Sequence, residues 1–174
     1  MSRQIADGTP DHIDTRREQW DRELPDVDTV GMAILGRARW IALMARPHIE
    51  AVFARYGMDT GEFDVLSTLL RAGPPYRLRP TELYRSLMIS SGGMTDRLKR
   101  LERRGLISRP ATEGDKRSLP VALTTEGRTL AERAFREDMA VEKELLNSLS
   151  RADRDRLADL LRKLALSLPS SDKE

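Results

Sequence analysis

The segment from Arg79 to Thr125 constrains the fold more than any other, because its hydrophobic pattern changes at regular breaks. Two short amphipathic stretches are separated by a break at residues 89–90, and the second ends at Gly105, directly after two arginines. Their apolar residues recur at helical spacing: Leu83 and Leu87 in the first stretch, and Met94, Leu98 and Leu101 in the second. The pattern predicts two helices joined by a turn.

Two extended segments follow these helices and enclose a charged tip. The first starts at Leu106 and Ile107, the second ends with residues 121–123, and residues 113–117 fill the tip between them. Helix, turn, helix, strand, loop and strand is the order of a winged helix-turn-helix, whose second helix enters the major groove of DNA.

The charge of this region supports the same interpretation. Residues 77–117 contain 11 Lys and Arg against 5 Asp and Glu, a net charge of +6, whereas the whole chain carries only +2. A basic block inside a balanced protein is typical of a surface that binds a polyanion. The alternative is that these charges are solvated helix surfaces. Their coincidence with the helix-turn-helix and wing pattern favours double-stranded DNA as a partner.

Composition excludes several classes of function. The chain has no cysteine and two histidines, so disulfides, zinc ribbons and thiol catalysis are absent. No glycine-rich phosphate loop and no nucleophile–base or metal-ligand spacing occurs, so we expect neither an enzyme nor a cofactor or metal site. No apolar run approaches a membrane span, and the first residues lack a signal-peptide core. We therefore expect a cytoplasmic protein without a membrane partner.

Helical patterns flank the central segment on both sides. They predict helices over residues 11–24, 30–56 with a bend or break at Pro47, 60–71, and from Thr124 to residue 168 with a restart at Ser150. The predicted fold class is mainly α with a small β-wing. We expect an N-terminal extension with an extra helix (1–28), a winged helix-turn-helix lobe (59–125) and dimerisation helices (29–58 and 126–174).

The C-terminal leucine stripes predict a homodimer, because one small lobe is too small to cover them. Two recognition helices about one DNA turn apart would then read a pseudo-palindromic operator.

The central segment resembles the MarR family of bacterial transcriptional regulators. The resemblance lies in the helix-turn-helix, the wing sequence Asp115-Lys116-Arg117, residues 121–124 and Gly127, and it covers roughly residues 30–168. Residues 90–98, 100–102 and 61–66, with a tryptophan in an additional N-terminal helix, are similar to the urate-responsive UrtR or PecS-type branch. The resemblance implies a ligand-responsive repressor that urate or a similar purine releases from its operator.

We expect DNA contacts from the start and exposed face of the recognition helix and from the wing tip. Serine hydroxyls at the helix start cap the helix or contact phosphate, and glycines allow close backbone approach. An arginine at the tip suits a narrow minor groove, with Asp115 fixing it. Asp96 either accepts from cytosine or orients an arginine. The predicted DNA-binding residues are Ser90, Ser91, Gly92, Gly93, Thr95, Asp96, Lys99, Arg100, Asp115, Lys116 and Arg117.

The ligand residues follow from the resemblance to the urate-responsive branch. They are Trp20, Asp64, Arg97 and Arg109. An arginine fork suits the oxygens of a planar purine anion, and a carboxylate accepts its ring N–H groups. Alternatively, Asp64 and Arg97 form an ion pair on which Trp20 packs. Two other interpretations stay open: a regulator that senses a phenolic or xenobiotic compound, and a DNA-binding protein without a ligand.

Overall fold

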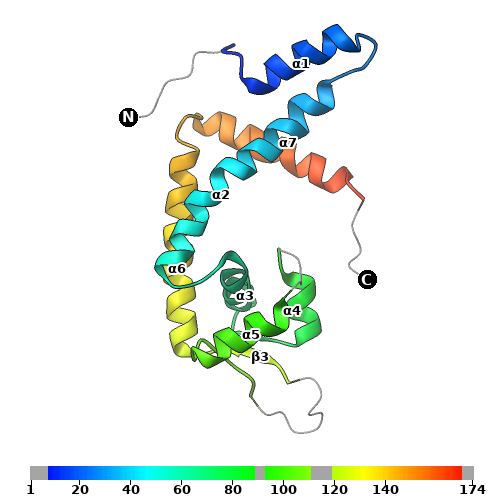
Figure 1. The fold of residues 1–174 in the computed structure, drawn as a ribbon. Helices are drawn as coiled ribbons and strands as arrows, with labels where there is room; N and C mark the ends of the chain where they lie inside the picture. The colour runs from blue at the N-terminus through cyan, green and yellow to red at the C-terminus, as the bar shows by residue number, and fades with distance from the viewer. Residues whose placement is uncertain (1–7, 89–92, 111–118, 170–174) are drawn as a thin grey trace. The chain divides into compact units, whose positions relative to one another are not determined.

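The computed structural model of the chain describes residues 8–88, 93–110 and 119–169 (Figure 1). The predicted fold class is confirmed, because helices dominate and three short strands form one small sheet. The elements, in chain order, are α1 (His12–Glu23), η1 (Met32–Gly36), α2 (Arg37–Arg55), α3 (Thr60–Arg71), β1 (Arg77–Leu78), α4 (Pro80–Ser86), α5 (Met94–Arg103), β2 (Ile107–Ser108), β3 (Val121–Leu123), α6 (Thr125–Leu145) and α7 (Arg151–Ser167).

The chain divides into two compact units. The winged unit comprises residues 50–141, and the helical unit comprises residues 8–49 and 142–169. Helices α2 and α6 each begin in one unit and end in the other. No helix among the described residues is long and apolar enough to cross a membrane.

The core of the winged unit lies where α3, α4 and α5 meet the sheet (Figure 1). The rings of Phe53 and Phe63 stack with centroids 4.1 Å apart. The apolar residues with no exposed surface come from α3, α4, α5, β3 and α6 of this unit: Val65, Leu66, Leu69, Leu83, Leu101, Val121, Ala131 and Ala134. The helical spacing predicted for Leu83, Leu98 and Leu101 is therefore confirmed, since all three are buried.

The sheet has β3 in the centre, antiparallel to β1 and β2 on either side. Ala122 pairs with Arg77 of β1 and with Ser108 of β2, so a strand just before the helix-turn-helix completes the sheet of the wing. Gly127, in the first turn of α6, lies against this sheet. A Cβ at Gly127 would overlap the backbone carbonyl of Leu106, so only glycine fits there.

Two ion pairs of Arg37 join helix α1 to the start of α2 within the helical unit. Arg37 Nε lies 2.8 Å from Asp11 Oδ2, and Arg37 Nη2 lies 2.6 Å from Asp14 Oδ1. Asp11 also caps α1, accepting the backbone N–H groups of Ile13 and Asp14. Hydrogen bonding to the Arg37 guanidinium lowers the pKa of both carboxyl groups. The acidic N-terminal extension therefore has its own electrostatic anchor.

The helix predicted over residues 30–56 contains one irregular turn, which lies near its start and not at Pro47. Pro47 lies inside α2 without a break, so of the predicted bend or break the break is wrong. The irregular turn is η1, a π-helical turn that runs directly into α2. At its end Gly36 lies under Ile13 of α1, where a Cβ would come within 3.3 Å of Ile13 Cδ1. The wider turn thus coincides with the place where α1 packs.

Helix α7 presents its leucines to solvent in the single chain. Ser150 caps it as predicted, accepting the N–H of Asp153 at 3.2 Å. None of the residues in α7 is buried. The exposed fractions of its stripe are large: Leu157 40%, Leu160 53%, Leu161 48%, and Leu168 56% just after the helix.

Candidate nucleic-acid interface and ligand site

Helix α5 separates its apolar and polar residues as the sequence predicts. Met94, Leu98 and Leu101 are buried, while Thr95, Asp96 and Lys99 are exposed. The helix begins after Gly93, whose φ of +72° is a left-handed conformation that favours glycine. The apolar face of α5 therefore packs against the core, and its polar face is exposed to solvent.

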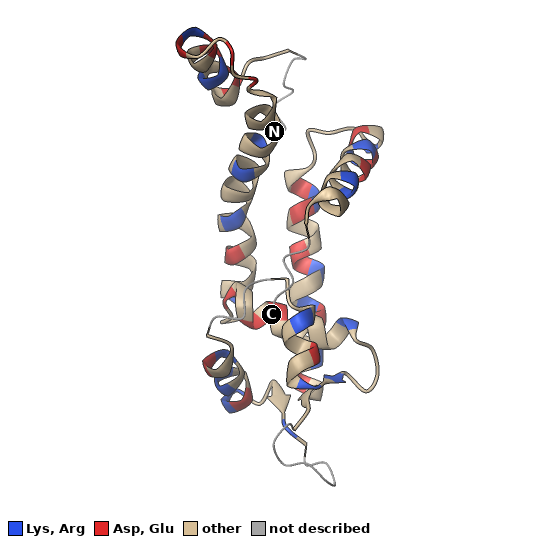
Figure 2. Ribbon diagram, turned by 90° about the vertical axis from the view of Figure 1, so that its right-hand side faces the viewer, with Lys and Arg blue, Asp and Glu red and all other residues tan. Residues whose placement is uncertain are grey.

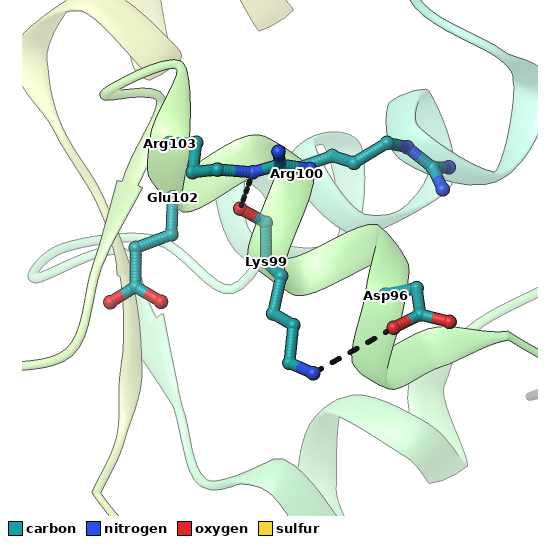
Figure 3. Close-up of a pocket in the computed structure, with 5 residues that line it drawn as sticks. All are labelled: Asp96, Lys99, Arg100, Glu102 and Arg103. Atoms are coloured by element: carbon teal, nitrogen blue, oxygen red, sulfur yellow. Dashed lines mark hydrogen bonds and ion pairs between the residues drawn. The ribbon is translucent and has the colours of Figure 1, made fainter.

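A hollow follows the exposed face of α5 and is lined by charged side chains (Figure 3). Lys99 Nζ lies 3.8 Å from Asp96 Oδ1, and Arg103 Nε donates to the Lys99 carbonyl at 3.4 Å. Asp96 was expected to orient an arginine or to read cytosine; in the structure its partner is a lysine one turn later. That pairing partly offsets a carboxylate that would otherwise repel phosphate.

Arg100, a predicted DNA contact, turns away from this face (Figure 3). Its Nε lies 2.7 Å from Glu62 Oε1, and its Nη2 lies 2.9 Å from Asp59 Oδ2. The hydrogen bond to the buried Glu62 raises the pKa of the Arg100 guanidinium above its usual value. Arg104 donates to the Gly57 carbonyl at 2.7 Å. Arg100 and Arg104 thus tie the recognition helix to the start of α3.

Arg97 lies between α5 and α3 and is mostly enclosed. Its side chain is 15% exposed, and its Nε is 3.8 Å from Asp59 Oδ1. The buried Nε and Nη1 atoms have no hydrogen-bond partner among the described residues. The guanidinium lies directly over Gly61, where any Cβ would overlap it. The absence of a side chain at Gly61 therefore allows Arg97 its position.

Asp64 lies three residues after Gly61, and so on the same face of α3. It is 7% exposed, and its Oδ2 accepts the backbone N–H of Met88 at 3.0 Å. Met88 lies two residues after the end of α4. The structure thus brings Arg97 and Asp64 to the face of α3 on which α4 and α5 pack.

The other two predicted ligand residues belong to other parts of the chain. Arg109 Nε is 3.5 Å from Glu102 Oε2. Glu102 follows Arg97 by five residues, or about 7.5 Å along the axis of α5. Trp20 belongs to α1 of the helical unit, where it is 47% exposed. Six predicted DNA contacts lie outside the described residues: Ser90, Ser91, Gly92, Asp115, Lys116 and Arg117.

The role of the two acidic residues at the start of α3, Asp59 and Glu62, was not predicted from the sequence. Asp59 accepts the N–H of Glu62 at 2.7 Å, and Glu62 accepts the N–H of Asp59 at 3.1 Å, a complete capping box. Its sequence signature, Asp59-x-x-Glu62, was available, but nothing in the sequence indicated that the same carboxylates bind arginines of α5. Within the described parts of the chain, no cluster of His, Asp and Glu has the arrangement of a metal site.

Comparison with known proteins identifies relatives of the whole arrangement. Residues 56–118 match the sequence model of the MarR family. The HTH-type transcriptional regulator PecS of Dickeya dadantii is 36% identical over 144 residues, covering 83% of this chain and 87% of PecS. The repressor Rv2887 of Mycobacterium tuberculosis is 32% identical over 124 residues, covering 71% of this chain and 87% of the repressor.

Solved structures are similar in fold. The structure of Rv2887 with salicylic acid has a TM-score of 0.61 and 30% identity, and covers 81% of this chain and 99% of its own. The structure of Sco3205 from Streptomyces coelicolor in complex with DNA has a TM-score of 0.71 at 23% identity, and covers 84% and 92%.

Proposed function

Because the chain belongs to the MarR family of transcriptional regulators, we propose that it is a homodimeric repressor that urate or a related purine anion releases from DNA. Members of this family bind DNA and are not enzymes. The operator is pseudo-palindromic, because the two recognition helices of a symmetric dimer meet inverted half-sites.

The exposed face of α5 supports the DNA-binding part of the proposal. Thr95, Lys99 and Arg103 are exposed, whereas the side chains that fix the helix face the core. A threonine methyl suits thymine, and a lysine suits guanine or phosphate. Arg117 at the wing tip then enters the minor groove. Contacts to phosphate fix the position of the helix on the DNA, and contacts to the bases select the DNA sequence.

The exposed leucines of α7 support the homodimer. Soluble proteins rarely leave a continuous apolar stripe in water, and a symmetric copy offers the same surface in return. Leu160 and Leu161 lie at the centre of this stripe.

The single observation that carries the ligand proposal is the pair of unpartnered nitrogens on the enclosed Arg97 guanidinium. Buried polar atoms are normally hydrogen-bonded, so each exception calls for a partner. Urate is a planar anion with several carbonyl oxygens, and it would accept from these nitrogens while its ring N–H groups donate to the Asp64 carboxylate.

The same residues provide a route from ligand to DNA. Arg97 lies on the recognition helix, and Asp64 accepts a hydrogen bond from the backbone N–H of Met88, just after α4. A ligand that draws on both residues therefore competes with the contacts that orient α5. A tenfold loss of DNA affinity needs only about 1.4 kcal/mol of difference in ligand affinity between the two conformations.

The test is a thermal melt with urate, followed by displacement of labelled operator DNA. Urate at 100 times its dissociation constant should stabilise the protein by about 2.7 kcal/mol. Arg97→Ala and Asp64→Asn should lose this stabilisation, whereas Arg85→Ala, an exposed arginine on α4, should keep it.

Other outcomes separate the alternatives. Stabilisation by salicylate but not by urate would make the chain a sensor of phenolic compounds, as its likeness to the salicylate-bound Rv2887 allows. If neither compound changes the melt or the DNA affinity, the protein binds DNA without a ligand. Retention of the urate response by Arg97→Ala would refute the proposed coupling.

A further inference from the structure

Both ends of α3 contact the helix-turn-helix. At the start of α3, Glu62 binds Arg100 of α5. In its last turn, Arg71 Nη2 donates a hydrogen bond to the backbone carbonyl of Ser86, the last residue of α4. Carbonyl groups in the last turn of a helix have no partner within that helix, so Arg71 supplies a donor that α4 itself lacks. This second contact has no part in the ligand site around Arg97.

The side chain of Arg71 is held in place by a residue of its own helix. The same Nη2 atom donates to Thr68 Oγ1 at 3.0 Å, about one turn earlier on α3, and Thr68 is only 1% exposed. A hydrogen bond to a buried hydroxyl restricts the rotation of a long and otherwise flexible side chain. Thr68 therefore orients the Arg71 guanidinium toward the end of α4.

A second side chain of α3 holds the backbone just beyond Ser86. Asp64 Oδ2 accepts the backbone N–H of Met88 at 3.0 Å. The two hydrogen bonds lie on either side of Leu87, whose side chain is buried. Because only residues 87–93 separate α4 from α5, the backbone fixed at this point gives the chain its direction as it leaves α4 for the recognition helix.

We propose that Arg71 is a positioning residue for operator binding, which acts through the carbonyl of Ser86 and does not itself touch DNA. Figure 2 shows Lys and Arg on helices throughout the chain, so the charge of Arg71 does not by itself mark a contact to phosphate. Its two hydrogen bonds are to groups of the protein. The proposal rests on the DNA-binding part of the proposed function and not on the response to urate.

Positioning and direct contact affect DNA binding differently. Contacts to base edges require one orientation of the recognition helix in the groove, whereas binding to any DNA sequence requires mainly the positive charge of the surface. Loss of Arg71 should therefore lower the affinity for a specific sequence and leave the non-specific affinity unchanged.

The test uses the full-length protein and two DNA duplexes. One duplex is selected from a random pool by the unaltered protein, and the other has the same base composition in scrambled order. Arg71→Gln should bind the selected duplex about tenfold more weakly, and the scrambled duplex within about twofold of the unaltered protein. The salt dependence of both affinities should stay the same, because no contact to phosphate is lost. A titration far above the dissociation constant gives the active fraction, so partial unfolding is not mistaken for weaker binding.

A second variant leaves the charge of Arg71 in place. Thr68→Val removes the hydroxyl that orients the guanidinium, so it should weaken binding of the selected duplex about threefold and leave the scrambled duplex unaffected. Ser67→Ala is its matched control, since the Ser67 hydroxyl donates to the carbonyl of Asp64 within α3. Arg22→Gln is the control for the loss of charge, because Arg22 belongs to the acidic N-terminal extension. Neither control should change the ratio of the two affinities.

Three outcomes would overturn the proposal. An equal loss for both duplexes in Arg71→Gln, with a salt dependence reduced by about one phosphate contact, would make Arg71 a direct contact to DNA. Unchanged affinity for the selected duplex would show that the end of α4 keeps its position without Arg71. If the unaltered protein selects no sequence from the pool, the proposed function fails together with this inference, which distinguishes that failure from the other two.

Discussion

Replacing Gly61 with alanine should separate ligand sensing from stability. The new Cβ would overlap the Arg97 guanidinium, which is the mobile end of a long side chain and can move away at little cost. Gly61 has an ordinary helical conformation in the first turn of α3, so alanine gains up to about 1 kcal/mol of helix propensity there. Against this stands the loss of the 3.8 Å ion pair between Arg97 and Asp59, at most about 1 kcal/mol for a partly exposed pair.

These terms nearly cancel, so the free energy of unfolding should change by less than about 1 kcal/mol, or about 4 °C in melting temperature. Ligand binding should respond far more. Arg97 would no longer present its unpartnered nitrogens, and the loss of charge-assisted hydrogen bonds worth about 1.5–3 kcal/mol raises the dissociation constant of urate about 10- to 150-fold.

The assays are a thermal melt without ligand and calorimetric titration with urate. Gly31→Ala is the matched control, since Gly31 also has a helical conformation but a Cβ there meets nothing within 4 Å. It should keep urate affinity, and its stability should rise by at most about 1 kcal/mol from helix propensity alone. A Gly61→Ala variant that binds urate within threefold of the parent would refute the role given to Arg97. A fall of more than about 10 °C would show that the backbone of α3, and not the arginine, had moved.

Three further predictions concern stability and assembly. Gly127→Ala should destabilise the winged unit by about 3 kcal/mol in a denaturant titration, because the Cβ meets the rigid carbonyl of Leu106; a change below about 0.5 kcal/mol would contradict this contact. Because the folded-state pKa of Asp11 is lowered, its stabilisation is complete above about pH 4 and disappears as the pH falls through the folded value. The protection of α1 amides from hydrogen exchange, relative to an unfolded chain at the same pH, should accordingly fall in acid, and Arg37→Gln should lower it already at pH 7; unchanged protection in that variant would exclude the anchor. Leu160→Asp should shift the protein toward monomer in sedimentation, and an unaltered dimer would place the interface elsewhere.

The secondary structure of the winged unit could be predicted closely because local signals agree there. The spacing of Leu83, Leu98 and Leu101 marks the buried helix faces, and Gly105 with a φ of +68° ends α5 where a side chain would be strained. Of the bend or break predicted at Pro47, the break is wrong, since the rule for proline considers one lost backbone donor. Packing along a long helix can outweigh that loss, as α2 shows.

Side-chain partners were much less predictable. Arg97, Arg100 and Arg104 look equivalent in the sequence, as basic residues on one short helix. In the structure Arg100 binds Glu62, Arg104 binds the backbone of Gly57, and of the three only Arg97 has buried nitrogens without a hydrogen-bond partner among the described residues. The difference depends on which side of α5 faces α3, and that orientation results from the burial of residues far apart in the chain.

The sequence by itself therefore determined the order of helices and strands, the position of the recognition helix and its basic character, because each depends on neighbours within a few residues. Only the tertiary structure decided that Gly61 makes room for Arg97, that Arg37 anchors α1, and that Glu62 binds Arg100. Those features arise where distant segments meet. There, van der Waals overlap and the pairing of buried polar atoms act over a few ångströms, and no local pattern records them.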